Sequence, residues 1–585
     1  MLKVFKNFTL KESMLALLSV LLIIFQVWLD LKLPDYMSEI TLLVQTQGSQ
    51  MSDIYAAGGM MLLCAFGSLL TAILVAVIAA KISTNFGANL REKLFGKVLD
   101  FSLEEISTFS TSSLITRSTN DITQVQMLII MGLQALVKAP ILAFMAVTKI
   151  MDKSWQWSLA TGIAVIILLV VVITALLLAL PKFKSLQKLT DNLTHVTREN
   201  LTGLRVVRAY NAEDYQENKF GVVNDILTAT HLFTSRTMAF IMPIIQLIMS
   251  GLSLAIYWIG AILINQAGVL DRITLFSDMI VFSSYAMQIV MAFMMLIIIF
   301  IMVPRAAVSA QRIQEVLDTE PTILDGSLSD AVNAEVGTVE FKNVTFKYPD
   351  AQTAVLEDVS FIAKPGETVA FIGATGSGKS TLVNLIPRLY DVTSGEILVN
   401  GIDVRQYSQE NLHDYIGYAS QKANLFEGSI KSNVAYGHNN RARVLDSDIV
   451  EAIEVAQASE FVEKLEDTYN APVTAGGTNL SGGQKQRVSI ARAIARQAEI
   501  LIFDDTFSAL DYRTDRQLRQ ALREEAADAT KLIVAQRIGT IKDADRIIVL
   551  EEGRIVGNGR HEELMANCQV YQEIAYSQLS KEELA

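Results

Sequence analysis

Six long apolar runs, all before Arg305, constrain this chain more than any other feature of its sequence. A helix needs about 20 apolar residues to cross the roughly 30 Å hydrocarbon core of a bilayer. Inside hydrocarbon its backbone must satisfy its own hydrogen bonds, which favours helices over open strands. The runs therefore predict membrane-spanning helices at Met14–Leu29, Ile54–Ala80, Met127–Val147, Ser154–Pro181, Thr237–Leu270 and Met279–Pro304.

Lysine and arginine concentrate in two of the segments that connect these runs. The segments after the second and the fourth run are rich in both residues, whereas the other three connections carry few. Because basic loops stay on the cytoplasmic side, these segments and both termini are predicted to be cytoplasmic in a multi-pass cell-membrane protein. No proline lies between Lys184 and Arg236, so helical extensions roughly 40 Å long are expected at about 1.5 Å per residue.

The composition changes near Gly337. Of the 585 residues 51% are hydrophobic and 19% are charged, an average over two unlike halves. The second half alternates β-branched strands, glycine-rich turns and helices, as α/β domains do. A transmembrane domain at 1–320, a linker at 321–336 and an α/β domain at 337–585 are therefore expected. The net charge of −12 argues against a nucleic-acid partner, because such proteins carry a basic face.

The strand predicted at Glu367–Ile372 leads into a glycine-rich turn and then a helical run. The turn reads Gly-x-x-x-x-Gly-Lys-Ser in the strand–loop–helix context of a P-loop. Its backbone N–H groups are expected to surround the phosphates of ATP at a helix N-terminus. Lys379 would reach the β- and γ-phosphates, and Ser380 would coordinate Mg²⁺. The predicted ATP-binding residues of the loop are Gly373, Ala374, Thr375, Gly376, Ser377, Gly378, Lys379, Ser380 and Thr381.

A second apolar strand, Ile500–Asp504, ends in a carboxylate. In P-loop nucleotide hydrolases such a carboxylate holds Mg²⁺ beside the phosphates. Four apolar residues and an aspartate are a common combination on their own. Downstream of a P-loop they predict that Asp504 and Ser380 are ligands of one magnesium ion.

Between these two motifs lies the pentapeptide Leu-Ser-Gly-Gly-Gln, which resembles the signature sequence of ATP-binding cassette (ABC) transporters. Other residues match the family's pattern in chain order. Tyr348 resembles the aromatic residue that stacks on adenine, and Gln421 resembles the Q-loop glutamine, which also contacts Mg²⁺. Ser508 and Asp511 resemble the ends of the D-loop. The signature residues, which would face the ATP of a partner, are Leu480, Ser481, Gly482, Gly483 and Gln484.

The resemblance extends to the membrane half. Six spans, long cytoplasmic helical loops and a fused C-terminal α/β P-loop nucleotide-binding domain of the ABC type resemble an ABC exporter half-transporter. This implies that two half-transporters pair in the bilayer, each ATP lying between one chain's P-loop and the other's signature. The segments near Leu114–Val125 and Arg208–Asp214 resemble the regions that dock on the nucleotide-binding domains.

Two positions depart from the family's pattern. Asp505 replaces the glutamate presumed to be the general base, and its carboxylate is retracted by about 1.5 Å, one C–C bond, although a general base needs hydrogen-bond reach. Gln536, after the strand Lys531–Ala535, replaces the switch histidine, and an amide has no titratable proton. None of the five histidines occupies that slot: His195, His231, His413, His438 and His561.

Both departures fall on the site built on this chain's own P-loop, while the signature and the D-loop keep the family's pattern. Harmless drift is one interpretation. The simpler hypothesis is the degenerate half of a heterodimeric exporter. In that case the catalytic set Gln421, Asp505 and Gln536 binds ATP with little hydrolysis. The signature then completes the competent ATP site of a second, non-identical half-transporter.

One face of the sixth span could contact a transported substrate. Ser284, Met287, Gln288, Met291 and Met295 recur at helical spacing. Methionine is flexible and polarizable, which suits a surface that accepts varied apolar ligands. Ordinary packing or lipid contact explains the same pattern equally well.

Lys138 is the only charge well inside a predicted span, and Pro140 follows it. An ionisable residue within the membrane is a candidate functional residue. The alternatives are snorkelling to the cytoplasmic headgroups or lining an aqueous cavity. If Lys138 contacts substrate, replacing it should change selectivity without changing basal ATP hydrolysis.

The combined departures resemble those of bacterial heterodimeric multidrug exporters, particularly from Gram-positive organisms. That resemblance implies a bacterial protein that moves amphiphilic small molecules out of the cytoplasm by alternating access. Export of a lipid or a peptide is an open alternative. A channel or sensor whose ATP-binding domains only gate is another.

Overall fold

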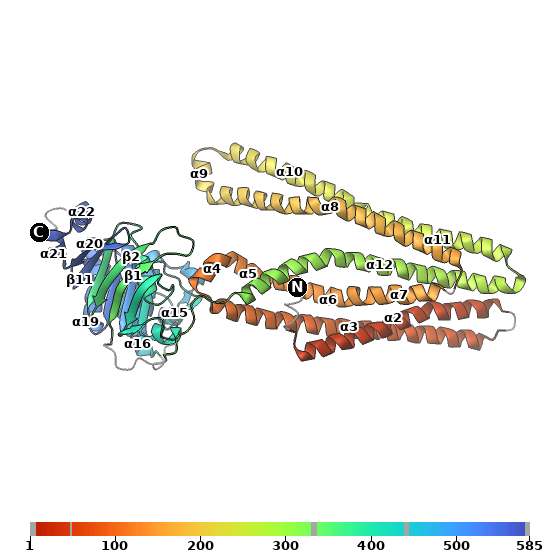
Figure 1. The fold of residues 1–585 in the computed structure, drawn as a ribbon, viewed down its shortest axis with the longest axis horizontal. Coiled ribbons are helices and arrows are strands. Elements are labelled where there is room, and N and C mark those ends of the chain that lie inside the picture. The colour runs from red at the N-terminus through yellow and green to blue at the C-terminus, as the bar shows by residue number, and fades with distance from the viewer. Residues whose placement is uncertain (1–7, 47–48, 152, 329–335, 438–443, 579–585) are drawn as a thin grey trace. The chain divides into compact units, whose positions relative to one another are not determined.

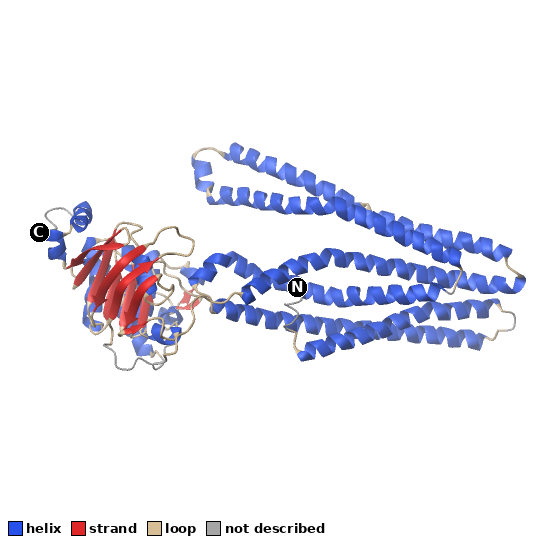
Figure 2. Cartoon of the chain, viewed as in Figure 1, coloured by secondary structure: helices blue, strands red, loops and turns tan. Residues whose placement is uncertain are grey.

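The computed structural model describes residues 8–46, 49–151, 153–328, 336–437 and 444–578. The chain divides into two compact units: residues up to Leu99 with Ser112–Thr319, and Asp100–Thr111 with the rest of the chain from Glu320. The first is helical, and the second holds all the described strands (Figure 2). His438 and residues 329–335 of the predicted linker lie outside the described residues.

Long helices build the first unit, and α8 and α10 run side by side in it (Figure 1). π-Helical turns at Arg117–Asp121 and Leu133–Val137 interrupt the third membrane-length helix. The helices are α2 (Leu10–Gln45), α3 (Met51–Leu99), α5 (Thr111–Thr116), α6 (Ile122–Gly132), α7 (Lys138–Met151), α8 (Trp155–Thr202), α9 (Leu204–Ala209), α10 (Glu213–Ala239), α11 (Ile241–Gln266) and α12 (Val269–Asp318).

Six helical segments are long and apolar enough to cross a membrane, which confirms the six predicted spans. Several helices continue far beyond their apolar runs. Helix α3 has 49 residues and α8 has 48, or roughly 70 Å at about 1.5 Å per residue. Helix α8 passes through Pro181 without ending there, and α2 continues past Leu29 to Gln45.

A short helix, α4 (Leu103–Phe109), belongs to the second unit although it lies between α3 and α5 in the chain. Ser102 caps it, and the Glu105 carboxylate accepts the backbone N–H of Thr322 at 3.0 Å. The predicted docking region Leu114–Val125 belongs to the first unit, whereas the neighbouring segment 100–111 groups with the second. Near the other predicted region, α9 is followed by a turn that precedes α10 at Glu213.

Two main sheets form the second unit. The larger has the strand order β12-β11-β3-β10-β9-β6 and is parallel except for the edge pair β11–β12. The smaller is antiparallel, in the order β2-β1-β4-β5. The strands are β1 (Val339–Phe346), β2 (Leu356–Ala363), β3 (Thr368–Gly373), β4 (Ser394–Val399), β5 (Ile402–Asp403), β6 (Ile416–Ala419), β7 (Gly428–Ser429), β8 (Pro472–Val473), β9 (Ile500–Asp504), β10 (Thr530–Val534), β11 (Arg546–Glu551) and β12 (Arg554–Gly559).

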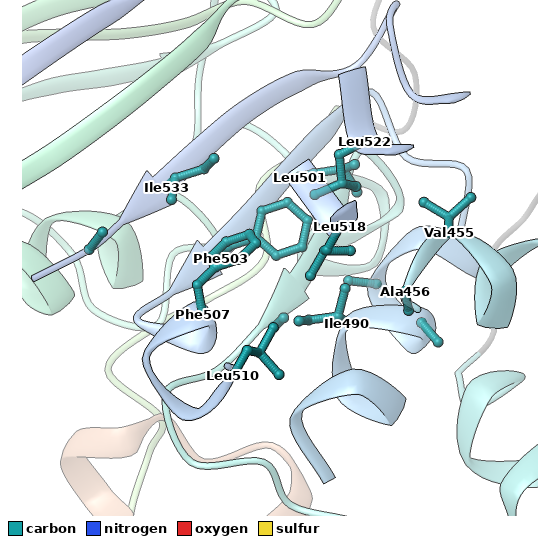
Figure 3. Close-up of a cluster of buried hydrophobic side chains, with 14 of the residues drawn as sticks. Val455, Ala456, Ile490, Leu501, Phe503, Phe507, Leu510, Leu518, Leu522 and Ile533 are labelled. Carbon is teal, nitrogen blue, oxygen red and sulfur yellow. The ribbon is translucent and has the colours of Figure 1, made fainter. Parts of the chain in front are cut away.

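Helices cover the larger sheet and bury its side chains. In Figure 3, Phe503 of β9 and Phe507 lie with Leu518, Leu522 and Ile490 of neighbouring helices in one cluster. Besides α4, the α-helices of this unit are α13 (Lys379–Leu385), α14 (Gln409–Asp414), α15 (Ile430–Val434), α16 (Asp446–Val455), α17 (Ser459–Val462), α18 (Gly482–Ala495), α19 (Tyr512–Glu525), α20 (Ile538–Ile541), α21 (His561–Asn567) and α22 (Gln569–Gln578).

The sheet order decides where the predicted site lies. Strands β3, β10, β9 and β6 are parallel neighbours, so their carboxyl ends meet at one edge. Ligands of open α/β sheets bind at that edge. The loop after β3, the end of β9 and the residues that follow β10 and β6 are the predicted nucleotide motifs.

Candidate functional site

The loop between β3 and α13 needs glycine at three positions. Gly376 and Gly378 have φ values of +87° and +94°, which side chains with a Cβ rarely adopt. A Cβ at Gly373 would lie 2.1 Å from the carbonyl oxygen of Leu550. The loop ends at Gly378, the N-cap of α13, and a glycine-rich loop that leads into a helix N-terminus suits a phosphate.

Lys379 lies buried beneath the loop. Its Nζ donates to the carbonyl oxygens of Gly373 and Ala374 at 2.9 and 2.8 Å. Burial lowers the pKa of the lysine, since removal from water disfavours the charged form. The structure thus places a cation directly at the phosphate-binding loop.

Two of the three predicted magnesium ligands, Ser380 and Asp504, are in contact. The hydroxyl of Ser380 donates to Oδ1 of Asp504 at 2.8 Å. Burial raises the pKa of Asp504, and the neighbouring charge of Asp505 raises it further. A divalent cation at this position would offset both effects. The donor set of a hydroxyl and a carboxylate suits Mg²⁺, which prefers oxygen ligands.

Three residues predicted to act in catalysis meet at Asp505. Oδ2 of Asp505 accepts a hydrogen bond from Nε2 of Gln536 at 2.8 Å and another from Nε2 of Gln421 at 3.3 Å. Asp505 is only 6% exposed and has a left-handed backbone, with φ of +49°. Aspartate tolerates that conformation better than most residues.

A pocket of about 320 Å³ contains most of these residues. Its lining includes Val355 and Val534, which belong to none of the predicted motifs. An apolar residue at the end of a strand is too common to be recognised from sequence as a pocket residue. Tyr348 is not among the lining residues. Its hydroxyl lies 3.0 Å from Oγ1 of Thr381, and its ring packs edge-on against Tyr390. The lining residues are Val355, Thr375, Gly376, Gly378, Lys379, Ser380, Thr381, Gln421, Asp505, Val534 and Gln536.

The predicted signature forms the start of helix α18. Ser481 is the N-cap, and a reciprocal capping box joins it to Gln484. Leu480 is buried and anchors the segment, whereas Ser481 and Gly482 are exposed. The first N–H groups of a helix have no partners within it, and here they lie at an exposed helix end. It shares no lining residue with the pocket described above.

The predicted D-loop lies between Asp505 and the start of helix α19. The hydroxyl of Ser508 donates to the backbone oxygen of Asp505 at 2.8 Å. Asp511 caps α19 by accepting the N–H of Thr514 at 3.0 Å, and these bonds lower the pKa of the aspartate. Ser508 thus joins the D-loop to Asp505, and Asp511 joins it to the start of α19.

In the membrane-spanning unit, the predicted substrate face lies on the less buried side of α12. Ser284, Met287, Gln288 and Met295 are partly exposed, and Met291 is 43% exposed. Their neighbours on the other side of the helix are buried in the bundle. The amide oxygen Oε1 of Gln288 is buried and has no hydrogen-bond partner among the described residues.

Lys138 has an acidic partner that the sequence pattern did not predict. Its Nζ lies 3.1 Å from Oδ2 of Asp30, with the side chains only 20% and 25% exposed, and Ser68 donates to the same carboxylate. The prediction ended the first span at Leu29, one residue before Asp30, so Lys138 is not the only charge among the spans. Pro140 has no N–H to offer the preceding turn, which explains the wide π-helical turn just before Lys138.

Replacing Lys138 by methionine is expected to destabilise the protein in detergent by about 3 kcal/mol, because breaking a buried ion pair leaves a charge uncompensated. The double variant Lys138→Met/Asp30→Asn should recover most of that loss. Unfolding by denaturant or heat measures the stability of the single and the double variant. Equal instability of the single and the double variant would contradict this account.

Comparison with known proteins agrees with the fold and the motifs. Residues 356–508 match the family described as ABC transporter, and residues 15–293 match the ABC transporter transmembrane region. An uncharacterized ABC transporter ATP-binding protein of Mycobacterium tuberculosis is 39% identical over 522 residues, which cover 89% of this chain and 87% of the relative.

Two further proteins extend the comparison. An ATP-dependent lipid A-core flippase of Pseudomonas aeruginosa is 32% identical over 513 residues, 88% of this chain and 83% of its own length. The solved structure of a bacterial Atm1-family ABC exporter with ATP bound has the same fold, with a TM-score of 0.80 at 23% identity over 98% of this chain and 100% of that one. The chain therefore belongs to the ABC transporter family, as an exporter half-transporter whose six-helix transmembrane domain is fused to an ABC nucleotide-binding domain.

Proposed function

We propose that this chain is one subunit of an ATP-driven exporter of amphiphilic molecules. In this proposal it binds MgATP on its own P-loop with little hydrolysis, and its signature completes the competent site of a non-identical partner. The contact of Asp505 with two amide side chains is the observation that carries this asymmetry.

The phosphate loop fits MgATP. Its left-handed glycines leave room for phosphate oxygens, Lys379 supplies a positive charge, and Ser380 and Asp504 would hold Mg²⁺ together with Gln421. Bound Mg²⁺ neutralises the charge that develops on the phosphates during transfer. Tyr348, whose hydroxyl lies beside Thr381, would stack on the adenine of ATP bound at this loop.

Asp505 is poorly suited to activate water. A general base needs a lone pair within about 2.6 to 3.2 Å of the proton that it removes. The Asp505 carboxylate is shorter than a glutamate and already accepts two amide N–H groups, one from Gln536 and one from Gln421. Gln536 itself can donate to phosphate but cannot take up a proton. Binding without efficient turnover follows from these features.

The signature supports the other half of the proposal. Ser481 and Gly482 are exposed at the start of α18, and the capping box leaves the helix end well ordered. Electrostatic stabilisation by preorganised N–H groups is a large contribution to phosphoryl transfer. An intact signature is therefore most useful to a partner whose own P-loop site carries a glutamate and a histidine.

The transmembrane unit supports amphiphilic substrates. The partly exposed face of α12 combines methionine side chains with the unsatisfied amide oxygen of Gln288. A flexible apolar surface with a few polar groups, here those of Ser284 and Gln288, can accept varied ligands. Lys138 stays a candidate substrate residue, although Asp30 already pairs with it.

A lipid is the second candidate substrate class. The relative from Pseudomonas aeruginosa, named an ATP-dependent lipid A-core flippase, aligns over 88% of this chain. Lipid-like amphiphiles would reach the α12 face from the bilayer itself. Both candidates require the same ATP chemistry and differ only in the transported molecule.

The function is tested with the chain purified alone and with the chain co-purified with its partner half-transporter. We expect ATP turnover at least about 10²-fold lower for the chain alone, because it lacks an effective general base. Everted vesicles containing the pair should accumulate a fluorescent cationic drug, whereas a labelled phospholipid assay reports flipping. Vigorous turnover by the chain alone would overturn the asymmetry, and ATP turnover by the pair without movement of either molecule would overturn export.

A further inference from the structure

Helix α22, at the C-terminal end of the described chain, packs on the nucleotide-binding domain close to the predicted switch residue. Tyr571 and Ala575 of this helix are fully buried. The helix contacts α20, β3 and β11, and α20 to α22 lie near one another in Figure 1. No nucleotide motif includes this helix, so its proximity to the site was not evident from the sequence.

Helix α20 begins two residues after Gln536 and lacks a local cap. Its N-cap residue is Arg537, whose side chain makes no capping hydrogen bond. The first N–H groups of a helix need acceptors from elsewhere, and arginine has no acceptor to offer. Oε1 of Gln578, at the end of α22, supplies one by accepting the N–H of Ile538 at 2.9 Å.

The same side chain also holds the switch residue itself. Nε2 of Gln578 donates to the backbone oxygen of Gln536 at 2.7 Å. The Gln578 amide thus bonds to both ends of residues 536–538, the switch segment. It accepts the N–H of Ile538 and donates to the carbonyl oxygen of Gln536. Nε2 of Gln536 in turn donates to Asp505 at 2.8 Å. The contacts connect α22 to the carboxylate beside the magnesium ligands.

We propose that Gln578 is a positioning residue that fixes Gln536 for contact with the γ-phosphate of ATP bound to this chain's own P-loop. The inference rests on the proposed function in that it takes Gln536 as the residue that senses bound nucleotide. Glutamine is suited to this task because its amide has a donor and an acceptor at a fixed separation. Glutamate keeps only the acceptor, and methionine has a similar length but no strong hydrogen-bonding group.

The test uses the full-length chain and a non-hydrolysable fluorescent ATP analogue with Mg²⁺. Gln578→Met removes both hydrogen bonds, and we expect the analogue to dissociate about tenfold faster, because the loosened Gln536 amide loses its hydrogen bond to the charged γ-phosphate, and one such bond typically accounts for about that factor. Gln578→Glu should have an intermediate effect because it can still cap Ile538. Gln569→Met is the matched control. It lies on the same helix, and among the described residues its amide donates to Glu573 on the helix surface, away from the switch segment.

Thermal unfolding without nucleotide separates positioning from a purely structural role. Positioning predicts faster dissociation with a midpoint within about 2 °C of the unmodified chain. A lower midpoint with an unchanged dissociation rate would overturn the inference, as would equal effects of Gln578→Met and Gln569→Met. Because the analogue is not hydrolysed, rapid ATP turnover by the unmodified chain would overturn the proposed function alone and leave this comparison valid.

Discussion

Replacing Gly482 by aspartate is expected to reduce ATP turnover of the complex with its partner by roughly 10² to 10³-fold. The substitution places a negative charge at the exposed start of α18, where the signature would stabilise the phosphates bound to the partner. The added charge would repel the partner's phosphates and offset the stabilisation by the preorganised N–H groups, one of which typically accounts for about that factor. Steady-state phosphate release by the purified complex measures the effect.

Two controls make this result specific. A Cβ at Gly482 would have no atom within 4 Å, so the variant should fold and should bind ATP on its own P-loop within about twofold of the unmodified chain. Ala475→Asp adds the same charge at an exposed position before the signature and should leave turnover nearly unchanged. If Gly482→Asp left turnover intact, the competent ATP site would not depend on this signature.

The second large effect is a gain of activity. The double variant Asp505→Glu/Gln536→His should raise the ATP turnover of the chain purified alone by about 10²-fold or more, the usual contribution of a general base. In this variant the carboxylate reaches about 1.5 Å further. An imidazole also replaces the Gln536 amide, which in the unmodified chain donates to Oδ2 of Asp505. Phosphate release at saturating MgATP measures it.

The single variants show how the two positions act together. Asp505→Glu alone should give a smaller gain, because Gln536 can still donate to the longer carboxylate. It should also cost about 1 kcal/mol of stability, since residue 505 has a φ of +49°, which glutamate tolerates less well than aspartate. No gain in the double variant would show that something other than these two residues limits turnover at this site.

The nucleotide motifs were predictable because each depends on a local requirement. The loop from Gly373 to Ser380 needs glycines where a Cβ would collide or φ is positive, and the structure has those contacts and angles. The six spans were predictable because a bilayer demands a minimum apolar length, and all six are present. Helix ends were less accurate, since polar residues continue a helix once neighbouring helices stabilise it.

Pairings between distant residues could not be predicted in the same way. Asp30 and Lys138 are separated by more than a hundred residues, and only the packing of α2 against α7 brings them together. Similarly, segment 100–111 belongs to the second unit through contacts such as that of Glu105 with Thr322. No local pattern marks either pairing.

The sequence by itself determined the membrane-spanning architecture, the P-loop, the signature and the two substitutions at Asp505 and Gln536, because these follow from chain composition and residue chemistry. The tertiary structure alone decided what those residues contact. The parallel order of β3, β10, β9 and β6 brings four loop segments to one sheet edge. There Asp505 accepts two amides, and α22 places Gln578 against the switch segment. Hydrogen bonds depend on distances of a few ångströms, which only the folded chain defines.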